Sequence, residues 1–135
     1  MIDDYAFYRC TSLNHMEMPN SVVRIGKHTF RYNTSLTDVK LAKRLSIIDE
    51  YAFGECGFSH ITLPDSIASA QAGAFINNEH LKSITIPAGM EGIGAACFEN
   101  NAVLDSVTFL TNSHTLTSGN NAFNLCPSLA HVNIA

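Results

Sequence analysis

A phenylalanine recurs along the whole chain at a nearly constant interval, and this spacing restricts the possible folds more than any other feature. The intervals of 23, 23, 22, 23 and 25 residues separate Phe7, Phe30, Phe53, Phe75, Phe98 and Phe123. A period in the range of about 20–50 residues is typical of proteins whose repeated units stack on one another. The sequence therefore predicts a solenoid rather than a globule built around one central core.

Further columns keep step with the phenylalanine. Six residues after it comes a leucine, except in the third copy, which is one residue short and offers Phe58. Cys or Asn stands three residues after each phenylalanine, in a column formed by Cys10, Asn33, Cys56, Asn78, Asn101 and Cys126. These columns divide one domain, 1–135, into repeats at approximately 2–24, 25–47, 48–69, 70–92, 93–117 and 118–135.

Each copy contains a short segment of alternating apolar residues, such as Val39 and Leu41, which predicts a strand with one buried face. Strands of successive copies run the same way around the coil, so we expect them to pair in parallel. A proline ends several of these segments, since it has no N–H for the next ladder bond; these are Pro19, Pro64 and Pro87. The Cys/Asn column is expected to bond backbone groups of a loop that joins no ladder.

The clearest copies read I-D-E-Y-A-F-G-E-C from Ile48 to Cys56 and L-K-S-I-T-I-P from Leu81 to Pro87. They resemble the BspA-like branch of the leucine-rich repeat family, with the pattern I-x-x-x-A-F-x-x-C-x-x-L-x-x-I-x-I-P. The resemblance covers the whole chain and implies a mainly β, right-handed coil with a parallel sheet on its concave face. Short turns or strands would then form the convex side. The chain departs from the pattern at Ala70, Gln71 and Ser118.

The resemblance also implies a non-enzymatic binding or adhesion module that is secreted or displayed at the cell surface. A structural spacer that displays another domain is the alternative. The formal net charge of −4 argues against nucleic acid or an anionic membrane as the main partner. No apolar run approaches the roughly 18 residues of a membrane span, and the repeat pattern begins at Ile2, which leaves no room for a signal peptide.

Both ends of the repeat array lack a polar cap, which natural solenoids usually carry. We therefore expect the chain to be a segment of a longer repeat protein, or to associate end to end through its terminal repeats. The polar stretch Thr111–Asn121 lengthens the fifth copy by two residues, and we expect it to bulge from the coil.

The four cysteines are expected to be reduced, buried and structural. Cys10 and Cys56 share a column two repeats apart, which places them roughly 10 Å from each other at about 4.8 Å per strand. A disulfide needs Cα atoms within about 7 Å. No C-x-x-C or clustered Cys/His spacing indicates a zinc site, and we expect no cofactor.

If the alternating apolar residues point inward, the residues between them form two outward columns on the predicted concave face. We expect these columns to contact a protein or glycan partner through His15, Glu17, Asp38, Lys40, His60, Thr62, Ser83, Thr85, Ser106 and Thr108. His15, Asp38 and His60 could also be interpreted as a metal site or a catalytic pair. The face is open and no nucleophile lies within reach of a buried base, so we expect neither.

Overall fold

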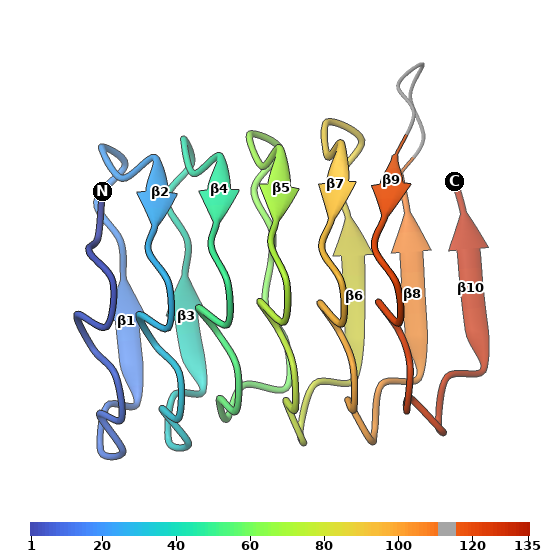
Figure 1. Cartoon of the computed structure of the whole chain (residues 1–135), viewed down its shortest axis with the longest axis horizontal. Coiled ribbons are helices and arrows are strands. Elements are labelled where there is room, and N and C mark those ends of the chain that lie inside the picture. The colour runs from blue at the N-terminus through green and yellow to red at the C-terminus, as the bar shows by residue number, and fades with distance from the viewer. Residues whose placement is uncertain (111–115) are drawn as a thin grey trace.

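The computed structural model describes residues 1–110 and 116–135, which form a parallel β-solenoid of about five turns without a helix in that part of the chain (Figure 1). Each turn passes along three walls. One wall carries the longer strands, the second carries two-residue strands, and the third carries the turns around the repeated phenylalanines. We call them the long-strand, short-strand and turn walls.

The long-strand wall consists of β1 (His15–Glu17), β3 (Asp38–Lys40), β6 (Ser83–Ile86), β8 (Ser106–Phe109) and β10 (His131–Ile134). The pairing is parallel, with Met16 opposite Val39 in one sheet and Ile84 opposite Val107 in the other. The predicted alternation is confirmed, because Ile84 and Val107 are buried while Thr85 between Ile84 and Ile86 is exposed.

The predicted parallel pairing on this wall is interrupted at the third copy. Residues 59–64 of the third copy form no strand, so a two-stranded sheet β1–β3 is separated from a three-stranded sheet β10–β8–β6. The shortened copy places Phe58 at the buried leucine position, edge-on to Phe53 and Phe75 at ring centroid distances of 6.1 and 6.5 Å. We attribute the broken pairing to this bulky ring together with the missing residue.

The short-strand wall is continuous through every copy. Its five-stranded parallel sheet has the order β2 (Arg24–Ile25), β4 (Ile47–Ile48), β5 (Ser69–Ala70), β7 (Gly92–Ile93) and β9 (Thr117–Ser118). Ile2 joins its edge through a bridge to Ile25. The departures at Ala70 and Ser118 leave the ladder intact, since the pairing uses backbone groups. Residues 111–115 of the predicted Thr111–Asn121 bulge lie outside the described residues.

The turn wall is built from residues with left-handed backbone angles, two residues before and two after each phenylalanine. Their φ values lie between 52° and 62°, and Gly73 is the one glycine among them. Such angles are costly for side-chain-bearing residues. Here they are offset by hydrogen bonds between copies, as in Phe30, whose N–H donates to the carbonyl of Ala52 at 2.8 Å.

The repeated phenylalanines stack through the centre of the coil. Successive ring centroids are 5.2–5.6 Å apart and successive rings are within 10° of parallel. Phe30, Phe53, Phe75 and Phe98 are completely buried, whereas Phe7 in the first copy is 41 % exposed. Close packing of this column removes the aromatic rings of the four inner copies from water.

The Cys/Asn column bonds the backbone as predicted. Oδ1 of Asn78 accepts the N–H of Cys56 at 2.8 Å, and Oδ1 of Asn101 accepts the N–H of Asn78 at 2.7 Å. Nδ2 of Asn78 donates to the carbonyl of Phe75 at 3.0 Å.

Where the next copy has a cysteine in this column, the cysteine thiol donates to the phenylalanine carbonyl of the preceding copy, in place of the asparagine amide of that copy. The thiol of Cys56 donates to Phe30 at 3.2 Å, and buried Nδ2 of Asn33 lacks a hydrogen-bond partner in the described structure. The same holds for Asn101, whose Nδ2 is also unsatisfied while the thiol of Cys126 donates to the carbonyl of Phe98. The choice between Cys and Asn therefore decides whether the preceding amide is satisfied.

Replacing Phe53 with alanine is expected to lower the free energy of unfolding by about 3–5 kcal/mol, because its ring is buried between two others. Phe7→Ala is the matched control, since Phe7 has a stacked partner on one side and is partly exposed. Urea unfolding measures both changes. Equal losses for the two variants would contradict a stack that is strongest in its interior.

Replacing Cys56 with asparagine is expected to raise the free energy of unfolding by about 1 kcal/mol, because Nδ2 of Asn33 would gain the carbonyl of Phe30. Cys10→Asn is the control, since no described asparagine precedes Cys10 in the column. Thermal melting compares the variants. A lower melting temperature for Cys56→Asn than for Cys10→Asn would show that the thiol, not the amide, suits this position.

Candidate functional site

The first candidate surface is the outer face of the long-strand wall, where the strand alternation directs polar side chains outward. In its N-terminal sheet, His15 lies opposite Asp38 and Glu17 lies opposite Lys40. Nδ1 of His15 is 2.7 Å from Oδ2 of Asp38, and Nζ of Lys40 is 3.1 Å from Oε1 of Glu17. All four side chains are more than half exposed, so water screens both pairs and each contributes little stability.

In the C-terminal sheet the two columns carry hydroxyl groups. Ser83 lies opposite Ser106, and Thr85 lies opposite Thr108. Thr85 is exposed, whereas Ser83, Ser106 and Thr108 are half-buried. These positions form two adjacent rows of neutral donors and acceptors on one sheet.

The third copy separates these two groups. His60 and Thr62 are exposed, as predicted, but they lie on a segment that pairs with neither neighbouring strand as a sheet. The structure thus places the ten predicted contact residues on one wall and divides them into three sets. In the described part of the chain, no three His, Cys, Asp or Glu side chains are close enough together to hold a metal ion.

The second candidate surface is the N-terminal part of the turn wall, where aromatic rings stack outside the phenylalanine column. Tyr5, His28 and Tyr51 stack in sequence, with ring centroids 4.8 and 5.1 Å apart. The guanidinium of Arg31 lies over the rings of Tyr32 and Tyr51 at 4.8 and 4.6 Å. The stack ends at Gly73, where an added Cβ would meet the ring of Tyr51 at 2.4 Å.

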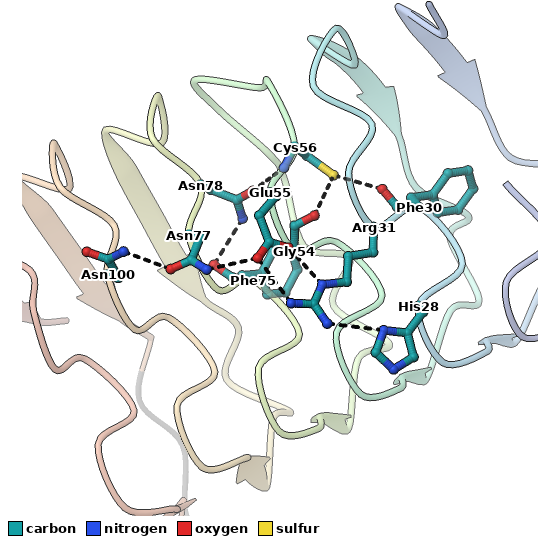
Figure 2. A network of polar contacts seen from close by, with 10 residues as sticks. All are labelled: His28, Phe30, Arg31, Gly54, Glu55, Cys56, Phe75, Asn77, Asn78 and Asn100. Atoms are coloured by element: carbon teal, nitrogen blue, oxygen red, sulfur yellow. Dashed lines mark hydrogen bonds and ion pairs between the residues drawn. The ribbon is translucent and has the colours of Figure 1, made fainter. Parts of the chain in front are cut away.

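Arg31 begins a chain of polar contacts that crosses four copies (Figure 2). Its Nε and Nη2 donate to the two oxygens of Glu55 at 2.9 and 3.1 Å. Nδ2 of Asn77 also donates to Glu55, at 2.8 Å, and Nδ2 of Asn100 donates to Oδ1 of Asn77 at 2.8 Å. The hydrogen bond to Glu55 raises the pKa of Arg31, while partial burial and the positive charge of Arg31 lower the pKa of His28.

Sequence reasoning missed this wall because its side chains do not follow the apolar period. The available signal was the column two residues after each phenylalanine, which contains Tyr32, Glu55, Asn77 and Asn100. These residues lie on the same wall in successive copies, so they can contact one another.

The expectation of four buried cysteines is correct for Cys56 and Cys97 and wrong for Cys10 and Cys126. The latter two are half-buried, because the first and last copies are covered by a neighbouring copy on one side. Burial raises the pKa of the Cys56 thiol far above its ordinary value and that of Cys97 to about 12. Neither thiol can supply a thiolate nucleophile near neutral pH.

Three-walled copies, parallel strands and an internal phenylalanine column define a leucine-rich repeat solenoid. The chain matches the family model for the BspA type leucine rich repeat region, in six copies over residues 1–134. The protein therefore belongs to the BspA-type leucine-rich repeat family. No curated protein matches it significantly.

Solved structures agree with this assignment. The chain is similar to the crystal structure of the Treponema pallidum leucine rich repeat protein, with a TM-score of 0.89 and 26 % identity. That match covers 98 % of this chain and 61 % of the other. A leucine-rich repeat protein from Bacteroides ovatus shares the fold at 19 % identity and a TM-score of 0.73, over 98 % of this chain and 43 % of the other. The chain thus spans less than two thirds of either protein.

No helix in the described residues could cross a membrane.

In the folded protein, Cys10 and Cys126 are expected to react with a thiol reagent much faster than Cys56 and Cys97, because only the first two are partly exposed. Alkylation of the native and of the urea-unfolded protein, followed by peptide mass spectrometry, measures the difference. We expect two modified cysteines before unfolding and four after it. Rapid labelling of Cys97 in the native state would contradict its place in the core.

Proposed function

We propose that this protein is a non-enzymatic interaction module that binds a partner protein or glycan through the outer face of its long-strand wall. The observation that carries the proposal is the pair of outward rows around Thr85 and Thr108, which the sheet holds in register with the adjacent copies. A partner can contact several such side chains at once without ordering a loop, which lowers the entropic cost of binding. Membership of a leucine-rich repeat family supports an interaction role.

The charges on this face favour recognition by shape and hydrogen bonds. The carboxylates of Asp38 and Glu17 are each within 3.1 Å of a basic nitrogen, so little uncompensated charge is available to attract a polyion. Binding should therefore depend less on salt than binding by a basic nucleic-acid protein.

The same geometry argues against catalysis on this face. The His15–Asp38 pair is 57 % and 73 % exposed, so solvent screens it and no dry pocket strengthens its electrostatic effect. The buried thiols of Cys56 and Cys97 have raised pKa values and face the core. We propose a location at the cell surface or outside the cell, in keeping with the BspA-type family.

The test compares a variant of the proposed face with a matched surface variant. His60→Glu, Thr62→Arg and Thr85→Arg are combined in the first, and Ser21→Arg, Arg44→Glu and Asp65→Arg in the second; all six positions are exposed. Binding to a panel of purified extracellular proteins and an oligosaccharide array is measured for both. We expect the first variant to lose at least about tenfold in affinity and the second to resemble the wild type.

Thermal melts check that both variants fold. Equal binding by the two variants would exclude the long-strand wall as the contact surface. If the wild type binds no member of the panel, the result favours a spacer that displays another domain.

A further inference from the structure

The shortened third copy leaves a notch at the corner between the turn wall and the long-strand wall. In the neighbouring copies two exposed residues stand at this corner, Thr34–Ser35 in the second copy and Glu79–His80 in the fourth. The third copy has Gly57 alone there, which is buried, because Phe58 already occupies the buried leucine position. The row of exposed corner residues is therefore interrupted for the width of one copy.

The backbone of the third copy packs back against the second. The N–H of Gly57 donates to the carbonyl of Leu36 at 3.1 Å, and an added Cβ on Gly57 would lie 2.3 Å from the carbonyl oxygen of Thr34. Space consequently opens on the side of the fourth copy. At about 4.8 Å per strand, the flanking corners are roughly 10 Å apart, which admits one sugar ring or one side chain but no helix.

Two hollows extend from this notch, and Glu79 and His80 line both of them. The hollow on the turn wall has a volume of about 410 Å³ and is also lined by Thr34, Glu55 and Asn100. The hollow on the long-strand side has a volume of about 440 Å³. Both volumes are in the range of small-ligand sites, about 300–1,000 Å³.

The turn-wall hollow offers hydrogen-bonding groups rather than an apolar floor. Glu55 and Asn77 are held by the polar chain from Arg31 (Figure 2), so their orientations are fixed before a ligand arrives. Tyr32 also lines the hollow, but the guanidinium groups of Arg9 and Arg31 lie over its ring, each at 4.8 Å. The ring therefore offers little open face for stacking.

The charges in the notch are mixed. Arg31 compensates Glu55, while Glu79 is accompanied by His80 on both hollows and by Lys82 on the long-strand side. A polyanion gains little here, and a cation would meet Glu79 beside basic groups. Interspersed donors and acceptors suit a ligand with several neutral hydroxyl groups, since each hydroxyl can both donate and accept.

We infer that the notch of the third copy binds one neutral pyranose unit of a glycan, with Glu79, His80 and Asn100 as hydrogen-bonding contacts. Recognition uses the turn-wall hollow, and the linked sugars leave along the corner toward the long-strand side. This site is separate from the rows of Thr85 and Thr108, so it extends the proposed interaction role and does not depend on it. A single sugar ring in such an open site is expected to bind weakly, with a Kd of about 1 mM.

The test titrates ¹⁵N-labelled protein with glucose, galactose and N-acetylglucosamine, and with sialic acid and lysine amide as charged probes. We expect at least one neutral sugar to shift the backbone amide signals of Gly57, Asn77 and Glu79. Sialic acid and lysine amide should shift them far less at equal concentration. Shifts caused by lysine amide alone would overturn the sugar assignment in favour of a cationic side chain.

Thr34→Arg fills the notch from one wall, and Thr11→Arg places the same side chain at the equivalent exposed corner of the first copy. We expect Thr34→Arg to weaken sugar binding at least about tenfold, Thr11→Arg to leave it unchanged, and Glu79→Gln to weaken it severalfold. Sugar binding should also survive Thr85→Arg, which separates this site from the long-strand rows. Equal affinity in Thr34→Arg and wild type, or no shift from neutral sugars at about ten times the expected Kd, would overturn the proposal.

Discussion

Each copy is attached to the next by the same small set of contacts at the repeated phenylalanine. Its N–H donates to a carbonyl of the following copy, as Phe53 does to Ala74 at 2.8 Å, and its ring stacks on the next ring. The hydrogen bond sets the spacing of the backbone and the stack fills the interior at that spacing. Both strand walls depend on this spacing, because ladders can form only when successive turns stand about 4.8 Å apart.

The third copy shows how much irregularity this arrangement tolerates. One missing residue and one bulky ring, Phe58, interrupt the ladder on the long-strand wall, while the short-strand wall continues unbroken through β4 and β5. The phenylalanine stack also continues across the defect, between Phe53 and Phe75 at 5.6 Å. Two continuous walls therefore support a local gap in the third, and that gap leaves the polar notch beside Glu79 and His80.

Most of the architecture could be predicted from the sequence, because periodic apolar residues directly report burial. Buried Leu36 and Leu81, the alternation around Thr85, and the bonding of Asn78 to the backbone all follow from column and period. The outward direction of the candidate rows was predictable for the same reason. The interrupted sheet was not predicted, since a period shows that a residue is missing but not how the backbone closes the gap.

The aromatic and polar chain on the turn wall was missed for a different reason. Its first members occupy left-handed positions at Tyr32 and Glu55, where no turn residue marks the angle, whereas Asn77 and Asn100 have a residue type that often adopts it. Glycine or asparagine at every one of these positions would have indicated left-handed backbone angles. Here the inter-copy hydrogen bonds impose them on tyrosine, arginine and glutamate, and the resulting contacts, such as Arg31 with Glu55, depend on geometry that appears only when the copies stack.

The backbone of the turn wall also has a net dipole along the axis of the coil. At each of the five junctions between copies, three backbone N–H groups of the turn wall donate forward, and the acceptor is always in the following copy. Parallel strands exchange bonds in both senses, so their dipoles largely cancel. The bonds of the turn wall align instead, as they do in an α-helix, but with the N–H groups directed toward the C-terminal copies. Along this wall the positive pole therefore lies at the end of the last copy and the negative pole at the first.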